Sequence, residues 1–333
     1  MFRQFNNRPI LIVGLPRSGT SWQFNVLSQS TTFYPIFEPD NRKINPFSHY
    51  YLEDNHRFPV DGGNNELFMN YLWLNIFTAK WKEGYIHRVL KFLYLKNNDW
   101  MEYNIQKYCG YKIPKNDMIR YLEYNFSQII LPNKYIIKIF EYFSKINIKN
   151  KIPLIKSVHC IRQLNWMQKN YNPKIVIITR KLPNLIASFL RLKMPDSLRG
   201  ISASPLFRNK VDKIIKNDNE QNDFIFHSII IQACELLTDL LSYHNLKNDS
   251  VLVNHEKACE NPVFHYKNLF SDLNLTWNNS IEKYIEGENK TGDGFIPQRR
   301  AEDEQIRYKD QLSHSQLNLI KEYAEVYNLV SYI

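Results

Sequence analysis

The segment Gly14-Leu15-Pro16-Arg17-Ser18-Gly19-Thr20 has the residue types of an anion-binding loop, placed between the apolar run Ile10–Val13 and an expected helix. A tight loop that leads into a helix N-terminus turns several backbone N–H groups toward one point, which favours a negative charge. Gly14 and Gly19 allow the turn and the close approach of a ligand. The segment therefore predicts a site for a phosphate-like group.

The loop lacks the lysine of a nucleoside triphosphatase. Its glycines have the spacing of GxxxxGK(S/T), but Thr20 stands where the lysine belongs. A triphosphatase also needs an aspartate after another strand to help hold Mg²⁺, whereas later strands end in Thr179-Arg180 and Asn254-His255. Arg17 supplies the positive charge instead. A P-loop kinase or NTPase that lacks the usual lysine is the alternative function.

A second group of polar residues follows the expected strand Lys174–Thr179. Arg180 comes directly after it, Pro183 suits a first helical turn, and Ser188 lies further along that helix. Ligands of parallel α/β sheets bind at the carboxyl ends of the strands. We therefore expect Arg180 and Ser188 to bind a second anion beside the first.

Together the two motifs resemble those of the PAPS-dependent sulfotransferases, whose donor is 3′-phosphoadenosine 5′-phosphosulfate (PAPS). PRSGTSW, at residues 16–22, is similar to their 5′-phosphosulfate loop, and Arg180, Pro183 and Ser188 are similar to their 3′-phosphate motif. Residues 251–262 resemble a third motif of the family, with His255 where tyrosine is usual. The resemblance implies a P-loop-like sulfotransferase fold and transfer of a sulfuryl group to a hydroxyl or amine of a small-molecule acceptor, with natural products among the candidates.

The resemblance also implies a role for each motif residue. The donor's 5′-phosphosulfate would lie on the loop residues Gly14, Pro16, Arg17, Ser18, Gly19, Thr20 and Ser21. Arg180 and Ser188 would hold the 3′-phosphate, while Trp22 would either lie near the adenine or pack its helix. Lys156 would sit on the sulfuryl oxygens or on the bridging oxygen, and Arg17 would share the charge of the leaving group. A basic segment containing Arg299 and Arg300 would either close over the nucleotide or form a solvated pair.

An acceptor hydroxyl must also lose a proton, and two residues are candidate bases. Glu38, in Phe37-Glu38-Pro39 after Tyr34-Pro35-Ile36, is expected near the carboxyl end of a short strand. It resembles the glutamate after the first helix in family branches that act on glycans and tyrosine. His159 lies three residues after Lys156, whereas another branch has its histidine two residues after the lysine. Because strand side chains alternate between faces, this spacing turns His159 away from Lys156 unless the strand has already ended. We therefore favour Glu38 and keep His159 as the second candidate.

The elements that must position these residues form an α/β pattern. Continuous apolar runs predict buried parallel strands at Ile10–Gly14, Pro153–Val158, Lys174–Thr179 and Val251–Asn254. Helices are expected at 19–29, 183–193, 223–243 and 262–273, so the fold class is a central parallel sheet flanked by helices. We expect one domain over 1–333, with 40–150 as a helical, aromatic-rich insertion on the acceptor side. A separate second domain is the alternative.

Composition and charge limit the kinds of ligand and partner that we expect for this protein. The 43 Lys and Arg residues outnumber the 33 Asp and Glu residues, and the net charge of +10 allows an anionic ligand. No aromatic RNA-binding signature is present, so no nucleic-acid partner is expected, and the four cysteines lack metal-ligand spacing. The apolar stretch 224–241 contains Glu235 and Asp239, which favours a buried helix over a membrane span. With no export signal before the first strand, we expect a cytoplasmic, metal-independent enzyme.

Overall fold

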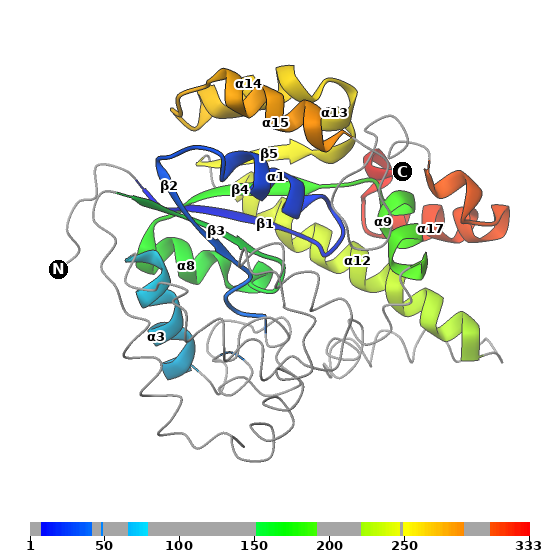
Figure 1. The fold of residues 1–333 in the computed structure, drawn as a ribbon. Helices are drawn as coiled ribbons and strands as arrows, with labels where there is room; N and C mark the ends of the chain where they lie inside the picture. The colour runs from blue at the N-terminus through cyan, green and yellow to red at the C-terminus, as the bar shows by residue number, and fades with distance from the viewer. Residues whose placement is uncertain are drawn as a thin grey trace, which may run out of the picture.

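The computed structural model describes residues 8–41, 48, 66–78, 151–191, 221–246, 249–289 and 307–333. Within them, five strands form one sheet in the order β2-β3-β1-β4-β5 (Figure 1). They are β1 (Ile10–Gly14), β2 (Phe33–Phe37), β3 (Ile152–Ser157), β4 (Lys174–Thr179) and β5 (Ser250–Asn254). Every pairing is parallel. The carboxyl ends of all five strands therefore meet at one edge of the sheet.

Helices cover both faces of the sheet (Figure 1). One face carries α1 (Thr20–Leu27), α13 (His255–Glu260), α14 (Pro262–Asp272) and α15 (Asn279–Glu288). The opposite face carries α3 (Glu66–Phe77), α8 (Leu164–Tyr171), α9 (Leu182–Arg191), α12 (Gln221–Leu246) and α17 (His314–Val326). Short 3-10 turns lie at Ile161–Gln163, Arg307–Asp310 and Val330–Tyr332.

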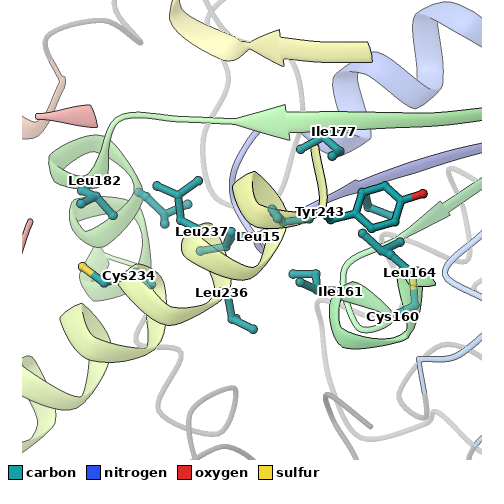
Figure 2. Close-up of a cluster of buried hydrophobic side chains, with 14 of the residues drawn as sticks. Leu15, Cys160, Ile161, Leu164, Ile177, Leu182, Cys234, Leu236, Leu237 and Tyr243 are labelled. Atoms are coloured by element: carbon teal, nitrogen blue, oxygen red, sulfur yellow. The ribbon is translucent and has the colours of Figure 1, made fainter. Parts of the chain in front are cut away.

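Strand alternation divides the apolar side chains into two cores. Leu11 and Val13 of β1 join the larger core under α8, α9, α12 and α17, part of which is drawn in Figure 2. Ile10 and Ile12 join the core under α1, α14 and α15. Because successive side chains of a strand face opposite sides, a strand covered on both faces must be apolar throughout. This is why β1 and β4 read as unbroken apolar runs in the sequence.

The long helix α12 lies inside the protein. It has the length and apolar composition of a membrane span over Ile225–Leu246, but 67% of its apolar window is buried. It contacts α9 and α17, and Figure 2 shows its residues Cys234, Leu236 and Leu237 among apolar side chains of the larger core. Burial of this kind is typical of a core helix.

The predicted fold class is confirmed, with small differences at the ends of elements. β1 and β4 have the predicted bounds, while β3 begins and ends one residue before the expected Pro153–Val158. α14 begins at Pro262, where the Asn261 side chain accepts a hydrogen bond of 3.2 Å from the backbone N–H of Phe264. Of the expected insertion at 40–150, the described residues are 40, 41, 48 and 66–78, so its extent and role, like the single domain, stay predictions.

Candidate active site

At the edge of the sheet where the carboxyl ends of the strands meet, a polar residue follows each of four strands. Glu38 follows β2, His159 lies just beyond β3, Arg180 follows β4 and His255 follows β5. The loop Leu15–Gly19 leaves β1, the central strand, at the same edge. The topology thus brings the residues of both sequence motifs together, as expected for a ligand site of a parallel α/β sheet.

The loop after β1 has no room for side chains at its two glycines. A Cβ on Gly14 would lie 2.5 Å from Ser18 Oγ and 2.6 Å from the carbonyl oxygen of Ile178. Gly19 adopts a φ of 94°, and a Cβ there would lie 2.3 Å from His255 Nδ1. Only glycine fits both positions, so the sharp turn into α1 depends on them.

The two anion motifs are joined by direct hydrogen bonds. Arg17 Nε donates to Ser188 Oγ at 3.1 Å, and an Nη1 of Arg180 donates to the carbonyl oxygen of Arg17 at 2.7 Å. Ser18 Oγ is buried in the same loop and has no hydrogen-bond partner in the described part of the chain. Two guanidinium groups, a helix N-terminus and an unused hydroxyl therefore gather around one place, which favours a ligand with more than one negative charge.

Glu256 supports Arg180 from the side of β5. Its Oε1 lies 3.9 Å from Arg180 Nε, and both side chains are buried. The same oxygen accepts hydrogen bonds from the backbone N–H of Lys181 at 3.1 Å and from Asn184 Nδ2 at 2.9 Å. One carboxylate thereby fixes the first turn of α9 and the guanidinium that precedes it.

Trp22 lies in the first turn of α1 and is partly buried against the core on that face of the sheet. Its ring meets those of His255 and Tyr266 edge-on, with centroids 5.8 Å and 5.2 Å away. His255, which replaces the expected tyrosine, is buried between this ring and Gly19. The helix-packing alternative for Trp22 matches this position, and contact with an adenine stays a prediction.

Glu38 and Lys156 form a buried ion pair. The two residues are 5% and 2% exposed. Lys156 Nζ donates to Glu38 Oε1, and Asn41 Nδ2 donates to Oε2. The backbone N–H of Glu38 also donates to the carbonyl oxygen of Lys156 at 2.7 Å, because β2 and β3 are neighbours in the sheet.

The surroundings of Glu38 favour the charged carboxylate form of its side chain. Burial by itself raises its pKa, but the charges of Lys156 and His159 and the hydrogen bonds from Lys156 and Asn41 outweigh burial and hold the pKa below its usual value. Lys156 Nζ also lies 4.5 Å from the centroid of the Phe37 ring. The arrangement therefore offers a negatively charged acceptor of protons next to a cation.

His159 is nearer to this pair than strand alternation predicts. β3 ends at Ser157, so Val158 and His159 lie in a bend and no longer follow the alternation of the strand. His159 is buried, and its charge acts on the Glu38 carboxylate. The expectation that the strand reaches Val158 is wrong, and with it the reason for turning His159 away. The choice of base between Glu38 and His159 stays a prediction.

Two further residues beside this pair are absent from the sequence-based site. Asp40 is 5% exposed, and Ser157 Oγ lies 2.8 Å and 2.7 Å from its two carboxylate oxygens. Burial raises the pKa of Asp40 to about 7, against the hydrogen bond from Ser157, which lowers it. The sequence does contain a pattern that could have pointed to them. Asp40 lies two residues after Glu38, directly after β2, and Ser157 is the residue after Lys156.

Arg299 and Arg300 lie outside the described residues. Among the residues that the structure does describe, no three His, Cys, Asp or Glu side chains gather as a metal site would require.

Comparisons with solved structures give sulfotransferases among the structural neighbours of this chain. No protein-family model and no curated protein sequence matches the chain. The sulfotransferase domain from the curacin biosynthetic pathway is similar at 13% identity, with 96% of this chain and 98% of that one covered and a TM-score of 0.44. The sulfotransferase domain of the Synechococcus PCC 7002 olefin synthase has 12% identity, coverage of 97% and 98%, and a TM-score of 0.41. A Mycobacterium tuberculosis sulfotransferase has 10% identity, coverage of 95% and 76%, and a TM-score of 0.41.

Proposed function

We propose that this protein is a sulfotransferase that moves a sulfuryl group from PAPS to a hydroxyl or amine of a small-molecule acceptor. The linkage of the two anion motifs carries the proposal. Arg17 belongs to the loop after β1, yet its side chain bonds Ser188 of the second motif, while Arg180 bonds the backbone of Arg17. Anion sites so close together suit one ligand with separate 5′ and 3′ groups.

The residues of this chain fit such a donor. The loop amides, Arg17 and the unused hydroxyl of Ser18 suit the 5′-phosphosulfate, and Arg180 with Ser188 suits the 3′-phosphate. Thr20 stands in the place of the lysine that a triphosphate requires. A 3′,5′-bisphosphate nucleotide therefore matches the site better than ATP.

The proposed reaction is an in-line displacement at sulfur. The acceptor oxygen or nitrogen forms a bond to sulfur as the bond between sulfur and the 5′-phosphate oxygen breaks, and the bisphosphate nucleotide leaves with that electron pair. Lys156 and Arg17 stabilise the negative charge that spreads over the sulfuryl and leaving oxygens. Glu38 takes the proton that the acceptor loses. No step requires a metal, and we propose that the enzyme works without one in the cytoplasm.

Nucleotide binding tests the proposal without an identified acceptor. Calorimetry with the product nucleotide, 3′-phosphoadenosine 5′-phosphate, should give clear binding to the wild type, while ATP with or without Mg²⁺ should bind more weakly. Arg180→Ala removes a charged hydrogen-bond donor from the 3′-phosphate, and such bonds contribute about 1.5–3 kcal/mol. We therefore expect roughly 10- to 100-fold weaker binding of the bisphosphate nucleotide.

Arg8→Ala is the matched control. Arg8 precedes β1 at the opposite edge of the sheet, where it bonds Asp249 and the carbonyl oxygens of Asn172 and Pro173. Its removal changes the net charge by the same amount but should leave nucleotide affinity unchanged. A preference for ATP with Mg²⁺ over the bisphosphate nucleotide would instead favour the kinase or NTPase alternative.

A further inference from the structure

The backbone of Glu38 is held in an unfavourable conformation. Its φ is 41°, in the left-handed region that residues with a Cβ rarely adopt. Such a residue persists only where its surroundings fix it, and these residues gather at functional sites. The contacts around residues 38–41 must therefore hold this turn in place.

One side of the turn is held by Lys156 and Asn41. The backbone N–H of Glu38 bonds the carbonyl of Lys156, and the backbone N–H of Asn41 donates to the carbonyl of Glu38 at 3.1 Å. Lys156 and Asn41 also bond the two oxygens of the Glu38 side chain. These contacts fix the carboxylate, but they leave the following residues of the segment to be anchored.

Beyond Glu38, Ser48 Oγ donates to the carbonyl oxygen of Pro39 at 2.5 Å. The anchor of Asp40 is Ser157, the last residue of β3. Its hydroxyl donates to the carboxylate of Asp40 and accepts from the backbone N–H groups of His159 at 3.0 Å and Cys160 at 3.3 Å. A serine hydroxyl has one proton to donate and two lone pairs to accept with, so these contacts use all of its capacity. Successive residues of β3 thus hold the 38–40 segment at two points, Lys156 through Glu38 and Ser157 through Asp40.

We infer that Asp40 and Ser157 form a positioning pair that fixes the proton-accepting side of the proposed active site. The inference rests on the proposed function, in which Glu38 takes the acceptor's proton. The pair connects both candidate bases, because the hydroxyl that anchors the Glu38 segment also bonds the backbone of His159. Neither residue of the pair needs to touch the acceptor or the donor.

The test combines a side-chain titration with donor turnover. Selective ¹³C-glutamate labelling, with Glu38→Gln to assign the signal, gives the pKa of the Glu38 carboxyl in each variant. Ser157→Ala and Asp40→Ala should loosen the contact with Lys156 and raise that pKa by about 1 unit or more. Hydrolysis of PAPS, with water as the acceptor, should slow about 10- to 100-fold, because small misplacements of reacting groups have effects of this size. Affinity for the bisphosphate nucleotide should stay unchanged.

A conservative variant separates positioning from general damage. Asp40→Asn keeps an oxygen that accepts from Ser157, so it should retain most of the wild-type rate and titration. Ser228→Ala is the control, since it removes a buried hydroxyl of α12 that has no hydrogen-bond partner among the described residues. If Ser157→Ala does not fold, Asp40→Ala against Asp40→Asn makes the same comparison.

The outcomes distinguish this inference from the proposed function. An unchanged Glu38 titration and rate in folded Ser157→Ala and Asp40→Ala would overturn the positioning role, even if the bisphosphate nucleotide binds as proposed. Asp40→Asn as damaging as Asp40→Ala would overturn it as well. If the wild type does not bind the bisphosphate nucleotide, the donor assignment fails, and the Glu38 titration still decides whether the pair holds this carboxylate.

Discussion

Glu38→Gln removes the negative charge from the buried ion pair of Glu38 and Lys156. It leaves the shape of the side chain at position 38 almost unchanged. The glutamate carboxylate accepts from Lys156 Nζ at one oxygen and from Asn41 Nδ2 at the other. A glutamine has one oxygen and one NH₂ group, so its NH₂ must face one of these two donors. The variant therefore loses one hydrogen bond and leaves the Lys156 ammonium, 2% exposed, without its counter-charge.

The expected cost in stability follows from that burial. Removing one partner of a buried ion pair destabilises a protein by about 3–5 kcal/mol, because the remaining charge is left uncompensated. Native proteins are stable by about 5–15 kcal/mol in total. We therefore expect the free energy of unfolding to fall by a large fraction, and turnover of PAPS to fall about 10²- to 10⁴-fold if Glu38 is the base.

Urea denaturation and turnover are measured together on a small set of variants. Glu38→Gln should lower the denaturation midpoint by about 1–2 M. The double variant Glu38→Gln, Lys156→Met removes the stranded charge and should regain stability without regaining activity. Glu282→Gln is the control, because Glu282 pairs with Lys267 at 3.1 Å near the surface, where the two side chains are 33% and 46% exposed, and its loss should cost about 1 kcal/mol or less.

Two results would refute this reasoning. If Glu38→Gln has the same urea denaturation midpoint as the wild type, the Lys156 ammonium does not need the Glu38 carboxylate as its counter-charge. A Glu38→Gln protein that is folded and turns over PAPS at the wild-type rate, beside an inactive but folded His159→Asn, would assign the proton transfer to His159.

Three further predictions concern metal, pH and the loop. Turnover should survive EDTA, and loss of activity in EDTA that Mg²⁺ restores would favour the kinase alternative. Burial raises the pKa of Asp40 from 3.8 to about 7, so its contribution to stability is present below about pH 4 and is lost as the pH rises through 7. Between about pH 4 and pH 7 the free energy of unfolding of the wild type, measured by urea denaturation, should fall by on the order of 4 kcal/mol relative to that of Asp40→Asn. Parallel pH profiles of the two proteins would contradict this prediction. Gly19→Ala should weaken bisphosphate-nucleotide binding and destabilise the fold, because its Cβ would meet the His255 ring. The matched Gly287→Ala, in α15 with nothing within 4 Å, should stabilise by about 1 kcal/mol in thermal unfolding, and equal effects of the two would argue against a specific role for Gly19.

The α/β class and both anion motifs could be predicted from the sequence because their causes are local. A strand buried on both faces must be apolar throughout, so β1 and β4 appear at their true bounds. The Asn261-Pro262 helix start also depends on neighbouring residues only. The clashes that require glycine at 14 and 19, by contrast, involve Ile178 and His255, which are distant in the chain. The ends of elements depend also on contacts with distant residues, and the one-residue shift of β3 decides where His159 lies.

The order of residue types along the chain is enough to predict the phosphate-like loop, Arg180 with Ser188, and the candidates Glu38 and Lys156, because each follows directly on an apolar strand or a helix start. Which of these residues touch depends on how the strands are arranged in the folded sheet. The order β2-β3-β1-β4-β5 places Phe37 beside Lys156, although they are far apart in the chain, and this register produces the Glu38–Lys156 pair. The same pairing brings Asp40 to Ser157. Sheet order depends on long-range packing, which no local pattern encodes, and for that reason the positioning pair was visible only in the folded chain.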